Sequence, residues 1–190
     1  MKTIMIPKEE MEKRVARYDD LVPYGNQHTE NIDPKVFEQL TAKKVLSIMA
    51  PRNYKGRSSR APLKGEPGAV ISIAECPPGN APALHCHEQT VENFFIINGR
   101  FRIIWGDHGE ESLELGPLDF ISIPPGVNRS FINISDEYAR LLAIIQPVTE
   151  AQEDRVSFAR SVEGKLSGEF GPATVEALKN IGFHFDAGQD

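Results

Sequence analysis

Residues 79–99 read GNAPALHCHEQTVENFFIING, and two of the five histidines of the chain, His85 and His87, lie two positions apart in this stretch. Side chains of a strand alternate between its two faces, so a strand here places both imidazoles on the same face. A four-residue turn leads from there to Glu92, which begins the next predicted strand. Two imidazoles and one carboxylate suit non-haem Fe(II), and also Mn, Ni, Co or Zn. A His-x-His pair is often part of a hydrogen-bonded core, but the carboxylate, the turn and the flanking glycines favour a metal site.

Short apolar segments rich in Ile, Val and Phe alternate with Gly/Pro turns on both sides of this stretch. They predict strands over residues 69–75, 84–87, 92–97, 101–105, 112–115, 120–123, 130–134 and 139–146. Short strands at this regular spacing are typical of an all-β sandwich or barrel. The Asn98-Gly99 pair between two of them predicts a hairpin, because tight primed turns need positive φ angles.

The segments outside this core predict short helices. These are expected over residues 8–18, from Asp33-Pro34 onward, and over residues 151–161 and 173–180. The chain therefore divides into three parts. We expect an N-terminal arm with the first barrel strand or strands at residues 1–68, a barrel core at 69–147, and a helical C-terminal arm at 148–190.

The arm next to the core contains a run of basic residues without any acid. These residues are Arg52, Lys55, Arg57, Arg60 and Lys64. Glycine, proline and serine interrupt the run, which is typical of a solvated connecting loop. The alternative is a cationic lip that attracts anionic substrates.

The spacing of Gly79, His85, His87, Glu92 and Gly99 resembles the first sequence motif of the cupin superfamily. Residues 116–133 are similar to the second motif, with Leu118 in place of its usual first glycine. The resemblance spans about residues 69–147. It implies a double-stranded β-helix, which is a jelly-roll barrel of two antiparallel sheets with a metal in its mouth. It also implies a homodimer.

Arg129 stands where the second cupin motif normally has a histidine, which would be a fourth metal ligand. Arginine stays protonated and offers no lone pair, so the implied ligands are His85, His87 and Glu92 alone. In one interpretation these three retain the metal and Arg129 clamps a substrate carboxylate or phosphate. In the other, Arg129 pairs with Glu92 and the pocket binds its ligand without metal. We favour the first, because all three ligands are present.

Composition limits the remaining classes of function. The chain has 190 residues, a formal net charge of −6 and two cysteines, Cys76 and Cys86. Its acidic balance argues against nucleic acid as a partner, because phosphate binding needs a surplus of Lys and Arg. No apolar run is long enough to cross a membrane, and the first residues carry no secretory signal. We therefore expect a cytoplasmic protein without a disulfide.

The expected function is that of a metal-binding cupin, namely a non-haem Fe(II) dioxygenase-type enzyme that oxidises a small carboxylate-bearing organic molecule. A metal with open positions can also act as a Lewis acid, which would support a redox-neutral isomerase, decarboxylase or lyase. A third alternative is a non-catalytic cupin that binds a small molecule, because one fold can carry many functions.

Overall fold

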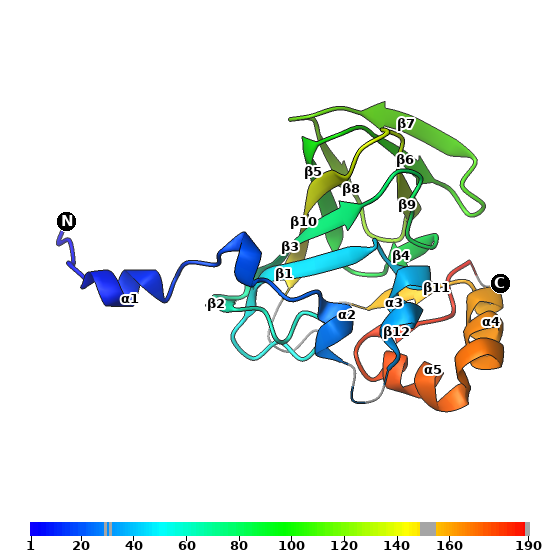
Figure 1. Ribbon diagram of the computed structural model, residues 1–190, viewed down its shortest axis with the longest axis horizontal. Helices are drawn as coiled ribbons and strands as arrows, with labels where there is room; N and C mark the ends of the chain where they lie inside the picture. The colour runs from blue at the N-terminus through cyan, green and yellow to red at the C-terminus, as the bar shows by residue number, and fades with distance from the viewer. Residues whose placement is uncertain (29, 31, 149–154, 189–190) are drawn as a thin grey trace.

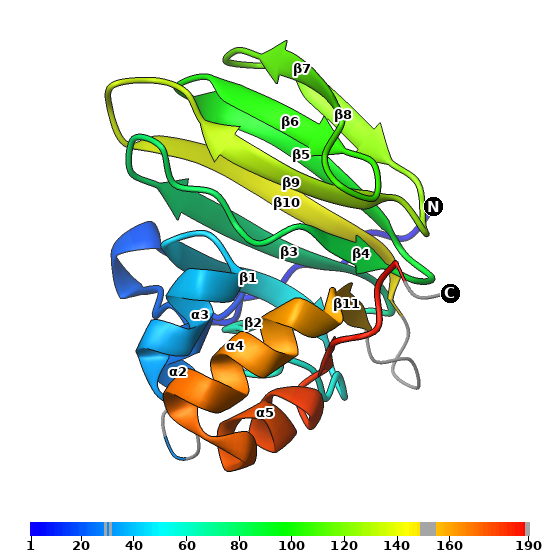
Figure 2. The ribbon, with the colours of Figure 1, turned by 90° about the vertical axis from the view of Figure 1, so that its right-hand side faces the viewer.

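The computed structural model describes residues 1–28, 30, 32–148 and 155–188. Within these residues the strands form two sheets of six (Figure 1, Figure 2). The first sheet, in spatial order, consists of β2 (Leu63–Gly65), β1 (Lys44–Pro51), β3 (Gly68–Cys76), β10 (Ala139–Val148), β5 (Val91–Asn98) and β8 (Phe120–Ile123). The second consists of β12 (Phe183–His184), β11 (Val156–Phe158), β4 (His85–His87), β9 (Asn128–Asn133), β6 (Phe101–Trp105) and β7 (Glu111–Leu115).

The two sheets pack against each other through apolar side chains. Phe94 of β5 and Phe131 of β9 meet edge to face, with ring centroids 5.2 Å apart, although their strands belong to different sheets. Phe131 also contacts Phe101 of β6 in the same geometry. The expected strands correspond to β3 to β10, and most pairs are antiparallel. The expected all-β, double-stranded barrel is confirmed.

The Asn98-Gly99 turn is present, but the predicted hairpin is wrong. The neighbours of β5 are β10 and β8, whereas β6 pairs with β7 and β9, so this turn carries the chain from one sheet to the other. Gly99 has a φ of 76°. A Cβ atom there would lie 2.4 Å from the Cβ of Ala139, so close packing as well as backbone conformation requires glycine.

Leu118 adopts a backbone conformation that usually belongs to glycine. Its φ is 71°, and the amide of Asp119 donates to the carbonyl of Gly116 across a tight turn. A turn of this kind normally has glycine at its third position, because a Cβ atom is strained at positive φ. Leu118 therefore keeps the conformation of the glycine that it replaces in the resemblance.

Both arms contribute helices, which pack below β1, β4 and β11 in Figure 2. These helices are α2 (Tyr24–Gln27), α3 (Pro34–Leu40), α4 (Arg160–Phe170) and α5 (Pro172–Lys179). The expected start of α3 is confirmed, since the side chain of Asp33 accepts a hydrogen bond from the Lys35 amide and Pro34 is the first helical residue. Their apolar faces form a second core with the C-terminal strands, whose buried members are Tyr24, Ile32, Val36, Phe37, Leu40, Val156, Phe158, Leu166, Val175, Leu178, Phe183 and Phe185.

The helix predicted over residues 151–161 is only partly correct. Residues 151–154 lie outside the described residues, and residues 156–158 form β11 rather than a helix. All three residues of β11 are buried, and the strand pairs antiparallel with β4, so pairing with the barrel determines their conformation. The C-terminal arm is therefore a mixture of helices and the short strands β11 and β12, which extend the second sheet.

The first residues of the chain project away from the barrel (Figure 1). They carry the short helix α1 (Lys8–Glu12), which buries no residue, followed by a 3-10 turn at Tyr18–Asp20. Ile4 and Met5 are almost fully exposed. Among the described residues, no helix combines the length and apolar character needed to cross a bilayer.

Candidate metal centre

The two histidines lie on β4, in the interior of the molecule. His85 pairs with Arg129 of β9, and His87 pairs with Val156 of β11, so both neighbouring strands hold this short strand in place. Both side chains are buried, and their ring centroids are 5.5 Å apart. Cys86, between them in sequence, is half-buried and forms no disulfide. The predicted common face of the two imidazoles is confirmed.

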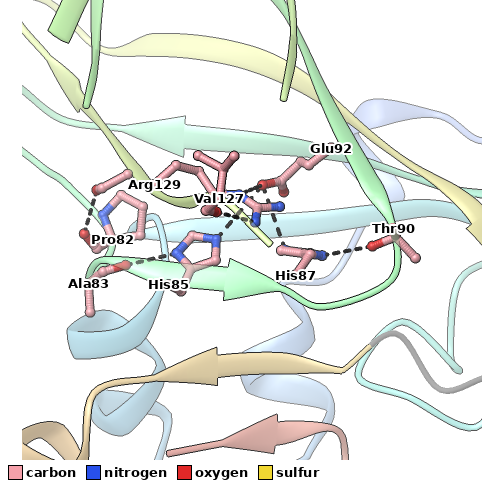
Figure 3. Close-up of polar contacts among 9 residues, drawn as sticks. Pro82, Ala83, His85, His87, Thr90, Glu92, Val127 and Arg129 are labelled. Carbon is pink, nitrogen blue, oxygen red and sulfur yellow. Dashed lines mark hydrogen bonds and ion pairs between the residues drawn. The ribbon is translucent and has the colours of Figure 1, made fainter. Parts of the chain in front are cut away.

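Glu92 approaches the histidines from the opposite sheet. It lies on β5, whose neighbours are β10 and β8, so it is not on a strand paired with β4. Its Oε2 atom is 3.6 Å from Nε2 of His87 and 3.8 Å from Nε2 of His85. Figure 3 shows the three side chains converging. The prediction that the three side chains come together is therefore correct. The turn after β4, however, places Glu92 on the opposite sheet and not on a strand next to β4.

Nε2 of each imidazole is the nitrogen near Glu92, and a contact of the second ring nitrogen, Nδ1, orients each ring (Figure 3). Nδ1 of His85 lies 2.8 Å from the carbonyl oxygen of Ala83, and Nδ1 of His87 lies 3.2 Å from the hydroxyl of Thr90. A carbonyl can only accept, so Nδ1 of neutral His85 carries the proton and Nε2 keeps its lone pair. Outer contacts of this kind fix the ring and the tautomer of metal-binding histidines.

The carboxylate of Glu92 is ionised within this buried site. Burial by itself raises the pKa of Glu92, because removal from water disfavours the charged form. Positive charge at His87 and at Arg129 outweighs that effect and holds the pKa of Glu92 well below its usual range. The site therefore presents one anionic oxygen toward two imidazole nitrogens.

These three residues fit a single divalent metal ion. Two atoms that bind one ion at about 2.1 Å each can lie at most about 4.2 Å apart. The two distances from Glu92 to the histidines meet this limit, and all three ligand atoms lie within 4.8 Å of one another. A small adjustment of the side chains closes the set around one ion. Nitrogen and oxygen donors of this kind suit transition metals.

Arg129 makes a contact that differs from the substrate clamp expected of it. The side chain is completely buried, and Nε donates to Oε2 of Glu92 at 3.0 Å (Figure 3). Nη1 donates to the carbonyl of Val127 at 3.1 Å, and Nη2 makes no hydrogen bond within the described part of the chain. The ion pair foreseen in the alternative interpretation is thus present, together with all three metal-ligand candidates. The clamp role of Arg129 stays a prediction.

A cavity of about 80 Å³ opens beside the three candidate ligands. Its lining is mainly apolar and includes side chains that come from far outside the barrel core, among them Tyr24, Arg57, Phe158 and Phe183. Burial raises the pKa of Tyr24 to about 12, so its phenol stays protonated at neutral pH. The basic run in the sequence indicated Arg57 without separating it from its neighbours, whereas no sequence signal indicated Tyr24. The arms therefore complete the pocket.

Residues 72–145 match the family model described as "Cupin domain". No curated protein matches the chain.

Similar solved structures share low sequence identity with the chain. The cupin domain of Schizosaccharomyces pombe Cnp3 is 19% identical, with a TM-score of 0.41, over 56% of this chain and 66% of that one. A protein with a double-stranded beta-helix domain from Klebsiella pneumoniae is 15% identical, with a TM-score of 0.45, over 65% and 90%. A Cupin 2 conserved barrel domain protein from Salinispora arenicola is 18% identical, with a TM-score of 0.42, over 56% and 78%.

Proposed function

We propose that this chain, whose residues 72–145 form a cupin domain, is a transition-metal-dependent enzyme that acts on a small carboxylate-bearing organic molecule. We put forward Fe(II) dioxygenase-type oxidation as its reaction, in which both oxygen atoms of O₂ enter the product. The observation that carries this proposal is the convergence of the buried side chains of His85, His87 and Glu92 at the wall of a cavity.

The ligand set supports an active rather than a purely structural metal. Structural zinc sites are usually closed by four protein ligands, whereas two imidazoles and one carboxylate leave positions for other molecules. An Fe(II) ion held by His85, His87 and Glu92 would activate O₂ toward the substrate, which would itself be the electron donor in the overall reaction. The chain orients the ligands through Ala83, Thr90 and Arg129. The mainly apolar lining of the cavity restricts the access of water to the reacting groups.

The first experiment tests the metal. Wild-type protein, purified without chelator, is compared with His87→Ala and with a matched surface control, His108→Ala, whose side chain is exposed in a turn. We expect one metal ion per wild-type and control chain by elemental analysis. His87→Ala should weaken metal affinity by more than the roughly 10- to 100-fold that loss of an outer contact costs. Wild-type protein that binds none of Fe, Mn, Ni, Co and Zn would refute the proposal.

The second experiment tests the reaction. Oxygen consumption by the Fe(II)-loaded protein is followed with a panel of aliphatic and aromatic carboxylates. Uptake that requires both Fe(II) and a carboxylate, and that His87→Ala abolishes, supports oxidation. Conversion of a carboxylate without oxygen uptake would instead assign redox-neutral Lewis-acid chemistry. Metal binding without any conversion would leave a non-catalytic binding protein.

The homodimer implied by the resemblance remains a prediction. We propose that the N-terminal arm contacts a second copy of the chain through Ile4 and Met5, which are 89% and 94% exposed. Light scattering should give twice the mass of one chain for the wild type and a smaller mass for Ile4→Ser/Met5→Ser. A monomeric wild type contradicts this.

A further inference from the structure

The face of the first sheet that points away from the second sheet carries a row of apolar side chains. Phe94 of β5 contacts the second sheet, so the next residue, Phe95, points outward because strand side chains alternate. Phe95 pairs with Phe120 of β8 on one side and with Leu142 of β10 on the other, and Leu142 pairs with Ile73 of β3. Side chains that are paired in this way share a face. The row therefore crosses four neighbouring strands.

This row belongs to a wider apolar surface that solvent reaches. Phe120 is 56% exposed, and Ile97, which also points outward from β5, is 40% exposed. Ile71 and Ile144 form a second apolar pair on the same side of the sheet. Contiguous apolar surface of this kind marks sites of protein contact. The residues that we call the apolar face are Ile71, Ile73, Phe95, Ile97, Phe120, Leu142 and Ile144.

The N-terminal arm leaves the barrel at the edge of this face. Tyr18 donates a hydrogen bond to Glu75 of β3, and Nε of Arg140 on β10 donates to the same carboxylate at 2.6 Å. Glu75 lies two residues after Ile73 and pairs with Arg140, so both lie on the side of the apolar face. The chain before Tyr18 projects away from the barrel (Figure 1). Its exposed apolar side chains, such as Met5 at 94%, are therefore carried away from the face instead of covering it.

We propose that the apolar face is the docking surface for a second copy of this chain, whose N-terminal arm lies across it. This inference rests on the homodimer proposed above and adds the surface that receives the arm. An arm that projects from the face of its own barrel is placed to meet the same face of another copy. Two-fold symmetry makes the contact reciprocal, so that each arm covers the face of the other copy.

The size of the face supports a contact that includes the arms. At the usual spacings within a sheet, four strands with three outward residues each cover roughly 400 Å². Each partner of a stable complex buries about 800 Å². The face alone is therefore too small for a stable dimer. The apolar side chains of the arm, Ile4 and Met5 among them, can supply the remaining contact area.

The first experiment measures association of the full-length protein by sedimentation equilibrium. Phe120→Ser and Ile97→Ser each remove an exposed apolar side chain of the face. Leu113→Ser is the matched control. Leu113 is an apolar residue, 37% exposed, on β7, which is the edge strand of the second sheet as β8 is of the first. Circular dichroism checks the folding of every variant.

Phe120→Ser and Ile97→Ser should each raise the Kd of the dimer at least roughly tenfold, because a two-fold contact loses the apolar side chain twice. Leu113→Ser should change the Kd by no more than roughly twofold. If both variants of the face dimerise as tightly as the wild type, the apolar face is not the docking surface. A loss in Leu113→Ser as large as in Phe120→Ser also overturns the inference.

The second experiment locates the arm directly. A benzophenone cross-linker is placed at Met5 in isotopically labelled chains, which are mixed with unlabelled chains before illumination. Mass spectrometry then separates links between copies from links within one chain. We expect links between copies, formed with residues of β5, β8 or β10. Links confined to one chain, or formed with another surface of the second copy, overturn the inference.

The outcomes separate this inference from the metal-dependent function. Phe120 lies on the outward side of its sheet, so Phe120→Ser should bind as much zinc as the wild type. Protein that dimerises through the face and binds no metal refutes the metal-dependent function alone. A wild-type dimer whose arm is cross-linked elsewhere keeps the homodimer and overturns the docking surface. A monomeric wild type overturns both, whatever metal it binds.

Discussion

Replacing Arg129 by methionine should destabilise the metal-free protein far more than replacing an arginine on the surface. Arg129 is fully buried and its Nε is 3.0 Å from Glu92, whose carboxylate is also buried. Removing one partner of such a pair leaves an uncompensated charge, which costs about 3–5 kcal/mol. For a chain of this length that corresponds to a fall in Tm of roughly 6–20 °C.

Arg102 provides the matched control. It donates to Glu114 at 2.9 Å, nearly the same distance, but both side chains are more than two-fifths exposed. An exposed pair contributes at most about 1 kcal/mol. Urea unfolding in the presence of chelator, followed by circular dichroism, should therefore rank Arg129→Met well below Arg102→Met. The two ion pairs differ mainly in burial, so the difference in stability between the variants measures the cost of removing the Arg129 charge from a buried carboxylate.

A double-mutant cycle identifies the cause of the loss. In Arg129→Met/Glu92→Gln both charges are gone, so the double variant should lose at least about 1 kcal/mol less stability than the sum of the two single losses. The reasoning is refuted if Arg129→Met loses less than about 1 kcal/mol or no more than Arg102→Met. It is equally refuted if the two single effects simply add, because the residues would then not interact.

Three further predictions concern the rest of the fold. The pKa of Glu75 is held below its usual range, since its hydrogen-bonded and ionic partners outweigh burial, which alone would raise it. The stability advantage of wild type over Glu75→Gln should be complete at pH 7 and shrink in urea titrations as the pH falls below about 4.3, and a gap independent of pH would contradict this. Gly99→Ala should cost more than about 1 kcal/mol, and more than Gly126→Ala, because both residues have positive φ but only a Cβ at Gly99 collides with Ala139. Leu118→Gly should raise stability by about 1 kcal/mol through relief of its positive φ, and an unchanged or lower Tm would argue against strain there.

The strands and the candidate ligands were predictable because both depend on short-range patterns. Alternating apolar residues and regular turns located β3 to β10. The two-residue spacing of His85 and His87 placed them on one face, and a short turn kept Glu92 within reach. Each of these features involves residues close in sequence, whose geometry the local backbone conformation dictates.

Strand pairing was less predictable than strand position. Asn98-Gly99 indicated a turn correctly, but the same local signal serves a hairpin or a crossing between sheets. The choice depends on which strands β5 meets, namely β8 and β10, and those lie farther along the chain. Pairing with β4 likewise imposed a strand on residues 156–158, where the local pattern suggested a helix.

By itself, then, the sequence determined an all-β barrel and a set of two histidines and one glutamate. The surroundings of that set depend on how distant segments pack. The tertiary structure paired Arg129 with Glu92 and turned Arg57 inward from a basic loop. It also placed Phe158 and Phe183 of the distant arm in the lining of the cavity. The reason is physical: side-chain spacing along a strand is a local property, whereas charge pairing and cavity shape depend on packing between segments far apart in the chain.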